Sequence, residues 1–330
     1  MKLDRRSFLA AAATTLAAPA AFAPAVFAPA AFAESAAPKE KFTVILDWFV
    51  NPDHAPLFTA RYIGAFDRAG LDVALVPPTD PDLPPRLLAA GKADAAVSYQ
   101  AQLYMLVDQG LPLRRTGTLI NKPLNTLTAL KRSGITKLTD LKGKKVGYSV
   151  AGMEQALIGT MLRHVGLSLA DVTLVNVNFQ LVTALMSNEV NAVIGTYRTY
   201  EDIQLAQAGL QPVIFLPENY GVPRSDELIL LSNTSGLASP ALPRFLAALQ
   251  EGANYLVKHP DQMLGRFLKD NPSLNDKLDI ASWKALPGYF AQDPAYLDTA
   301  RYTAYRDFML REKLIKQALP LDDYAVQIKV

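Results

Sequence analysis

Residues 47–54 bring aromatic and polar side chains together at a spacing that suits the binding of a flat polar ligand. They follow residues 42–46, a β-branched apolar run with the length of a strand. Turn-forming residues and then a proline indicate that a helix begins immediately afterwards. Trp48, Asn51 and His54 are therefore expected between a strand end and a helix start, where open α/β folds bind ligands. The alternative is that Trp48 packs in the core and His54 serves only the turn.

A second segment, residues 195–201, combines an aromatic ring with a carboxylate. Tyr197 and Glu201 are four residues apart and share one face if the segment is helical. A ring that stacks and a carboxylate that accepts N–H groups suit an amino-substituted heteroaromatic ligand. Loops after other expected strands carry further candidate groups: Ser98, Tyr99, Gln100, Gly152 and Tyr220. The alternative is that several of the tyrosines only line a contact between domains.

The familiar catalytic and metal-binding motifs do not occur in the sequence. His54, His164 and His259 have no sequence neighbour at a metal-ligand spacing, and neither H-E-x-x-H nor G-x-S-x-G is present. The glycine-containing loop at residues 149–152 lacks the fingerprints of a phosphate-binding loop. We therefore expect no catalytic residues, no metal and no cofactor, although distant residues can still assemble a catalytic site.

Composition indicates an ordinary globular protein with few sequence clues to a macromolecular partner. The 330 residues are 50% apolar and 19% charged, and their net charge is only +2. The basic residues within positions 1–33 account for that excess, so we expect no nucleic acid partner. The chain has no cysteine, which excludes disulfides, thiolate metal sites and a lipid-modified cysteine.

Residues 1–33 are expected to be an export signal. Arg5 and Arg6 precede an alanine-rich apolar run, as in twin-arginine signals, and prolines make that run a poor membrane-spanning helix. Ala31-Phe32-Ala33 is typical of a cleavage site before Glu34. We therefore expect a periplasmic protein without a lipid anchor, the alternative being that the segment stays as an uncleaved anchor.

Strands and helices alternate along most of the chain, which is typical of parallel α/β sheets. Residues 87–97 and 184–194 repeat one pattern, in which a helix end, a turn residue and a buried strand follow each other. This echo suggests two domains built on one plan. We expect residues 34–131 with 221–330 to form the first domain and residues 132–220 the second. Helical spacing prevails after residue 240.

Several landmarks together resemble the thiamine-pyrimidine family. They are the loop at residues 47–54, Gly70–Val73, Gly91–Asp94, Leu141–Tyr148 and Gly221–Pro223, within a resemblance that spans roughly residues 42 to 310. Members of this family are periplasmic pyrimidine-precursor-binding proteins of ABC importers and fungal pyrimidine synthases. The resemblance implies a type II periplasmic-binding-protein fold, with two α/β domains, two crossover segments and the ligand in the cleft. It also implies a monomer that docks transiently on an ABC permease.

Carried onto this chain, the resemblance implies that Trp48, Asn51 and His54 contact a pyrimidine from one domain. Tyr197 and Glu201 would contact it from the other. Residues 98–100 and the loop after Tyr148, which contains Gly152, would complete the cleft, with Tyr220 near it.

The residues of this chain at two positions, and its lack of cysteine, distinguish it from the fungal synthase branch of the family. The fungal synthases carry a lysine that binds pyridoxal phosphate and a reactive histidine, where this chain has Ser98 and Gln102. They also use a cysteine cluster, and this chain has no cysteine. We therefore expect a binding protein and no enzyme, with the synthase as the alternative from another class. A receptor for a flavin or a sulfonate is the alternative within the class, although Glu201 disfavours a sulfonate.

Overall fold

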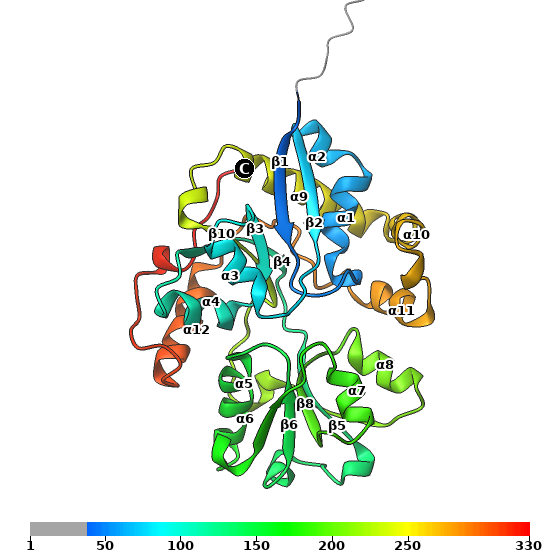
Figure 1. The fold of residues 1–330 in the computed structure, drawn as a ribbon, viewed down its shortest axis with the longest axis vertical. Coiled ribbons are helices and arrows are strands. Elements are labelled where there is room, and N and C mark those ends of the chain that lie inside the picture. The colour runs from blue at the N-terminus through cyan, green and yellow to red at the C-terminus, as the bar shows by residue number, and fades with distance from the viewer. Residues whose placement is uncertain (1–37) are drawn as a thin grey trace, which may run out of the picture. The chain divides into compact units, whose positions relative to one another are not determined.

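Two five-stranded sheets form the framework of the part of the chain that the computed structural model describes, residues 38–330 (Figure 1). The expected export signal at residues 1–33 and its cleavage site lie outside the described residues. The first sheet has the order β2 (Leu71–Val76), β1 (Glu40–Ile45), β3 (Ala95–Ser98), β10 (Leu228–Asn233), β4 (Leu113–Ile120). The second has the order β7 (Thr173–Asn176), β6 (Lys145–Tyr148), β8 (Ala192–Tyr197), β5 (Asn125–Leu130), β9 (Pro212–Phe215).

The two sheets follow the same plan, which confirms the expected fold class of two α/β lobes. In the first, β1 pairs in parallel with β2 and β3, while β10 runs antiparallel between β3 and β4. In the second, β6 pairs in parallel with β7 and β8, while β5 runs antiparallel between β8 and β9. Strands β3 and β10 are almost fully buried, as expected for strands covered by helices on both faces.

Helices cover both faces of each sheet (Figure 1). The first lobe carries α1 (Ala55–Tyr62), α2 (Ala65–Arg68), α3 (Leu83–Ala89), α4 (Gln100–Asp108) and the C-terminal helices α9 (Ala241–Lys258), α10 (Pro260–Asp270), α11 (Lys277–Ala285) and α12 (Thr299–Arg311). The second carries α5 (Met153–Ala156), α6 (Ile158–His164), α7 (Leu181–Met186) and α8 (Glu201–Gln207). Helices α1 and α9 approach so closely that a Cβ at Gly252 would come within 2.6 Å of the Ala60 nitrogen. No helix within residues 38–330 is long and apolar enough to cross a membrane.

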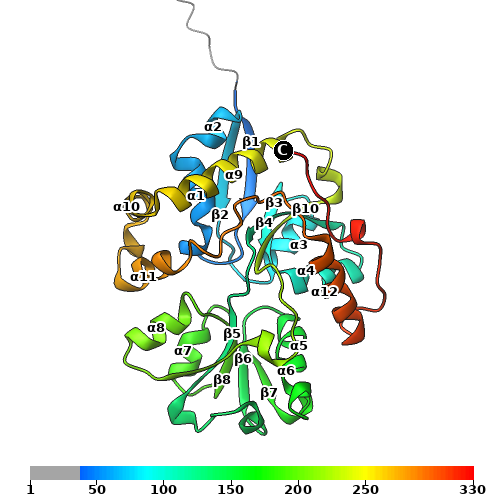
Figure 2. The ribbon, with the colours of Figure 1, turned by 180° about the vertical axis from the view of Figure 1, so that it is seen from behind.

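The chain crosses between the lobes twice (Figure 2). It leaves β4 and enters β5 through residues 121–124, and it returns from β9 to β10 through residues 216–227. Strand β5 belongs to the second sheet from Asn125 onward, although the expected first domain extends to residue 131. The exact domain boundaries stay a prediction.

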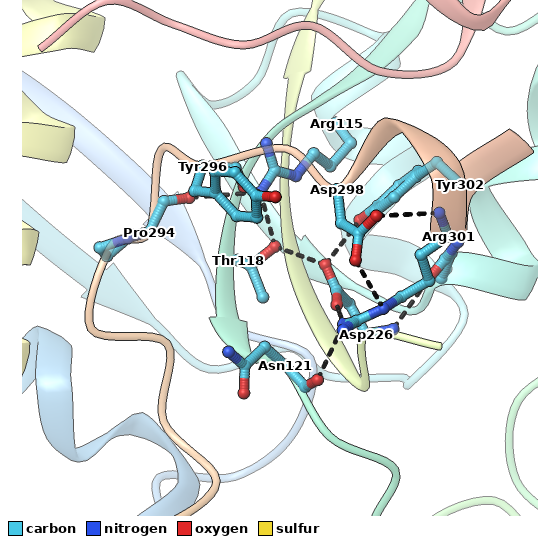
Figure 3. Close-up of polar contacts among 10 residues, drawn as sticks. Arg115, Thr118, Asn121, Asp226, Pro294, Tyr296, Asp298, Arg301 and Tyr302 are labelled. Atoms are coloured by element: carbon cyan, nitrogen blue, oxygen red, sulfur yellow. Dashed lines mark hydrogen bonds and ion pairs between the residues drawn. The ribbon is translucent and has the colours of Figure 1, made fainter. Parts of the chain in front are cut away.

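A buried polar network fastens the return crossover to the first lobe (Figure 3). Asp226 accepts hydrogen bonds from Thr118 Oγ1 at 2.9 Å and from the Tyr302 hydroxyl at 3.1 Å, and it pairs with Arg301. The fully buried Arg115 donates to Thr118 and to main-chain carbonyls of the segment before α12. Because Asp226 is buried and both of its carboxylate oxygens accept from groups of the first lobe, it holds its end of the crossover in place.

Candidate functional site

Loops from both lobes enclose a cavity of about 290 Å³. Its walls come mainly from the carboxyl ends of β1, β3, β6 and β8 and from the starts of β5 and α8. The carboxyl ends of parallel strands share one sheet edge, which is the usual ligand position in this architecture. The polar and aromatic groups on the walls are Asp47, Trp48, Phe49, Asn51, Asp53, Tyr99, Asn125, Tyr148, Ser149, Tyr197, Tyr200 and Glu201.

The loop after β1 is organised around the carboxylate of Asp47. His54 Nε2 lies 2.9 Å from one carboxylate oxygen, and the Tyr99 hydroxyl donates to the other at 2.9 Å. The Asn51 N–H donates to His54 Nδ1, so the proton of a neutral imidazole lies on Nε2 and points at Asp47. His54 is completely buried and does not line the cavity, so it holds Asp47 in place rather than facing a ligand.

The turn at residues 51–54 leaves one acidic group at the cavity unsatisfied. Asn51 Oδ1 accepts from the Asp53 N–H at 2.8 Å and its Nδ2 donates to the Phe49 carbonyl, so its side chain serves as a helix cap. Asp53 Oδ1 is buried and has no partner. Burial raises the pKa of Asp53 well above its usual range, and the nearby charge of Asp47 adds to the effect.

An aromatic cluster from both lobes lies at the cavity. The ring centroid of Trp48 is 4.6 Å from that of Phe179, edge to face, and Phe49 lies 4.3 Å from Phe179. Phe49 is 52% exposed, which is unusual for a phenylalanine and leaves its ring available at the rim. Trp48 thus lines the cavity, and Phe179 is an aromatic neighbour that the sequence did not indicate.

On the other wall, Glu201 begins α8 and turns back toward β8. Its carboxylate accepts from the Tyr197 N–H at 2.8 Å. Burial raises the pKa of Glu201 to about 7, against the opposing effect of hydrogen bonds from the backbone. The Tyr197 hydroxyl is buried without a partner, whereas Tyr200 donates to Asp279 at 3.3 Å. Tyr197 and Glu201 thus both line the cavity, Tyr197 from the end of β8 and Glu201 from the start of α8 rather than from one helix face.

The structure brings five of the ten expected site residues to the cavity: Trp48, Asn51, Tyr99, Tyr197 and Glu201. The other five do not line it: His54, Ser98, Gln100, Gly152 and Tyr220.

The role of His54 is given above, and Ser98, Gln100, Gly152 and Tyr220 each make other contacts in the described structure. The Ser98 hydroxyl donates to Gln102 Oε1 at 2.7 Å, and Gln100 Oε1 accepts from the Asp226 N–H at 2.8 Å. Gly152 has a positive φ of 88° at the start of α5, and Tyr220 packs edge to face on His164. Gln100 still lies near the site, because it borders a much smaller cavity that shares Tyr99 and Asn125 with the main one.

Sequence reasoning missed Asp53 and Asn125, which line the cavity, and Phe179, which packs on Trp48 and Phe49 of the lining. Asn125 is the clearest case, because it is the first residue of β5, at the point where the chain enters the second lobe. In the sequence, Asn125 is a polar residue two positions after Pro123, which is a weak indication of a binding residue. Only its hydrogen bond to Glu227 in the folded protein sets it apart.

Charge and hydrogen-bond capacity at the cavity favour a ligand that donates hydrogen bonds. Among the described residues that line it, the ionisable acids are Asp47, Asp53 and Glu201, and none is lysine, arginine or histidine. Unpartnered buried acceptor oxygens belong to Asp53 and Asn125, and the Tyr197 hydroxyl, which can both donate and accept, is also without a partner. A buried acceptor without a partner costs about 1–3 kcal/mol, which a ligand N–H group can recover.

Comparisons with known proteins agree with this architecture. A family model described as NMT1/THI5 like matches residues 51–263. A putative thiamine biosynthesis protein from Haemophilus influenzae is 47% identical over 88% of this chain and 93% of its own. The formylaminopyrimidine-binding protein of Halalkalibacterium halodurans is 33% identical over 72% of each chain. In fold, the alkanesulfonate-binding protein SsuA from Xanthomonas axonopodis pv. citri superposes with a TM-score of 0.69 at 15% identity, covering 88% of this chain and 99% of that one.

Proposed function

Because the chain belongs to the NMT1/THI5-like family, we propose that it is a solute-binding receptor of an ABC importer for an aminopyrimidine precursor of thiamine. The ligand class is the hydroxymethylpyrimidine or formylaminopyrimidine type. The observation that carries this proposal is the cavity itself, which combines aromatic walls with several acceptors and no cationic side chain among its described lining residues. A relative with 33% identity is named for binding formylaminopyrimidine, which supports the same ligand class.

The chemistry of an aminopyrimidine matches these groups. Its flat ring can stack on Trp48 or Tyr197, and its amino group can donate to carboxylate or amide oxygens. Glu201 is the proposed principal acceptor, because a carboxylate in a dry site makes stronger hydrogen bonds than a neutral oxygen.

Other ligands of this fold fit less well. A sulfonate calls for basic or N–H-rich surroundings, and the described lining residues offer acids instead. A flavin is larger than a single substituted ring, and a cavity of about 290 Å³ is at the small end of the ~300–1,000 Å³ typical of drug-sized ligands. Both observations favour one small heterocycle.

A pyrimidine-synthesising enzyme is disfavoured by a specific contact. At the positions where the resemblance to fungal synthases calls for a cofactor-binding lysine and a reactive histidine, Ser98 and Gln102 hydrogen-bond to each other. Neither side chain can form the imine that pyridoxal phosphate makes with a lysine amine. We infer a binding protein rather than an enzyme.

The proposed receptor acts in the periplasm as a monomer. Export through the twin-arginine pathway and cleavage after Ala33 complete the proposal and follow from the pattern of residues 1–33. Transient docking on an inner-membrane permease is also part of the proposal and follows from the family resemblance. Closure of the two lobes around the ligand would present the permease with a surface absent in the open state.

Calorimetric titration of the purified protein tests the function. The probes are 4-amino-5-hydroxymethyl-2-methylpyrimidine, N-formyl-4-amino-5-aminomethyl-2-methylpyrimidine, riboflavin and ethanesulfonate. We expect tight binding of one or both aminopyrimidines and at least roughly hundredfold weaker binding of the other two. Tight binding of riboflavin or ethanesulfonate alone would overturn the proposal. Absorbance of bound pyridoxal phosphate in protein purified from its own host would favour the enzyme instead.

A further inference from the structure

Glu227 joins the two crossovers at the edge of the cavity. It lies one residue before β10, at the end of the return crossover, and is only 4% exposed. One carboxylate oxygen accepts from the main-chain N–H of Leu124 at 2.6 Å and of Asn125 at 3.0 Å. The other accepts from Asn125 Nδ2 at 2.5 Å. All the donors belong to the first crossover and the start of β5.

This arrangement determines which atom of Asn125 is left free. A carboxylate only accepts hydrogen bonds, so the amide nitrogen of Asn125 must face Glu227. The amide oxygen is then directed away from Glu227. Asn125 lines the cavity, and its Oδ1 is buried with no partner in the protein. The protein thus keeps an unsatisfied acceptor at the ligand site, which is a costly feature unless a ligand donates to it.

Glu227 has little freedom to turn away from Asn125. Its own N–H donates to the Ile120 carbonyl at 2.9 Å, and the preceding residue is Asp226. Figure 3 shows Asp226 fixed by Thr118, Arg301 and Tyr302 of the first lobe. The orientation of the Asn125 amide is therefore set by a buried partner that the fold holds in place, and not by a mobile side chain at the surface.

We propose that Asn125 is a specificity-determining residue whose Oδ1 accepts an N–H of the ligand, and that Glu227 is the positioning residue that keeps this oxygen toward the ligand. The inference rests on the proposed function and deepens it by naming how the site distinguishes an amino-substituted ring from its oxo-substituted counterpart. An amino group donates to Oδ1, whereas a ring carbonyl in the same place puts two acceptors against each other.

The proposal makes a distinctive prediction for Glu227→Gln. The two main-chain N–H groups require an oxygen, so the new glutamine must direct its Oε1 toward them. Its amide nitrogen then faces Asn125 and donates. The side-chain amide of Asn125 then flips, so that Oδ1 accepts from the glutamine and Nδ2 faces the cavity. One substitution outside the main cavity lining thereby replaces the acceptor at the ligand with a donor.

The test is calorimetric titration with two probes, 4-amino-5-hydroxymethyl-2-methylpyrimidine and its 4-oxo counterpart. We expect wild type to prefer the amino compound and Glu227→Gln to lower the ratio of affinities at least tenfold, in part by a gain for the oxo compound. Asn125→Ala should also lower the ratio but without that gain. Glu218→Gln is the matched control, because Glu218 lies on the same crossover and pairs with Arg198. It should leave the ratio unchanged.

The outcomes separate this inference from the proposed function. An unchanged ratio in Asn125→Ala, with binding of the amino compound retained, overturns the role of Asn125 while leaving the function standing. An unchanged ratio in a Glu227→Gln protein that unfolds at the wild-type temperature overturns the positioning role. If Glu227→Gln does not fold, the Asn125→Ala ratio still decides the specificity role. Folded wild-type protein that binds neither probe overturns both proposals.

Discussion

His54 and Asp47 meet beneath the ligand cavity, with His54 Nε2 at 2.9 Å from an Asp47 carboxylate oxygen and both side chains buried. A neutral histidine is sufficient for this contact, because the Asn51 N–H occupies the other ring nitrogen. The histidine that looks like a ligand contact in the sequence instead orients the loop that carries Trp48. Its contribution to binding is therefore indirect.

We expect His54→Ala to lower the free energy of unfolding by about 1–3 kcal/mol, because it leaves a buried carboxylate oxygen without its partner. Affinity for the aminopyrimidine should fall as well, since the loop after β1 loses its anchor. Urea unfolding and titration measure the two effects. His259→Ala is the control, because His259 is exposed and lies in the first lobe away from the cavity lining. Wild-type stability in His54→Ala would contradict the anchoring role.

Glu201→Gln is expected to weaken binding of 4-aminopyrimidines at least roughly tenfold, about 1.4 kcal/mol. The amide has the same size and can still accept from the Tyr197 N–H, but it offers the ligand a donor and no charge. Stability at pH 8 should barely change. Titration of wild type, Glu201→Gln and the exposed control Glu189→Gln decides the matter. Equal affinities in all three would remove Glu201 from the site.

Stability of the ligand-free protein should fall as pH rises from about 4.5 to 7. The pKa of Glu201 is raised by burial from 4.5 to about 7, so in this window the folded chain holds a proton that the unfolded chain has lost. The stabilisation is therefore complete below pH 4.5 and is lost as pH passes about 7. Asp202 and Asp279, whose pKa values burial raises to about 6, act in the same direction at lower pH.

Comparison of wild type with Glu201→Gln isolates the contribution of Glu201. Between pH 5 and pH 8 the variant should lose roughly 2 kcal/mol less free energy of unfolding, because this window covers most of the interval between 4.5 and about 7 and each pH unit of that interval is worth ~1.4 kcal/mol. Urea unfolding at several pH values measures both curves. Parallel curves would show that Glu201 titrates normally in the folded protein.

The aromatic cluster at the rim should slow the escape of the ligand. Phe179 of the second lobe packs on Trp48 and Phe49 of the first, and such pairs are worth about 0.5–1.5 kcal/mol. We expect Phe179→Ala to raise the dissociation rate about threefold to tenfold, with a smaller effect on association, as stopped-flow fluorescence of Trp48 can follow. Ile214→Ala removes an exposed apolar side chain from β9 and should change neither rate. Unaltered dissociation in Phe179→Ala would rule out the cluster as a barrier.

The export proposal predicts a mature protein that begins at Glu34 in the periplasmic fraction. Replacing the paired arginines, Arg5→Lys with Arg6→Lys, should abolish export, because the arginine pair is the feature by which such signals are recognised. Mass spectrometry of fractionated cells measures both results, and Lys2→Arg serves as a charge-preserving control. Wild-type protein that starts at Met1 in the cytoplasm would refute the proposal.

Local patterns in the sequence were sufficient for the fold class and for half of the candidate site. Apolar periodicity and turn residues identify a strand at residues 42–46 and loops at its end, because these signals depend only on near neighbours in the chain. Trp48 follows β1 and Tyr197 ends β8, so each lies at the carboxyl edge of its own sheet, as the local pattern predicts. The two strands belong to different sheets, and only the packing of the two lobes brings their side chains to one cavity.

The tertiary structure alone decided which polar groups remain free for a ligand. His54 already hydrogen-bonds to Asp47 and so is not free for a ligand. Asn125 is oriented by Glu227, which lies 102 positions away along the chain. Such pairings depend on how two crossovers lie against each other, and no local pattern encodes them. A side chain's type states which hydrogen bonds it can make, but only its folded neighbours determine which of them are already made.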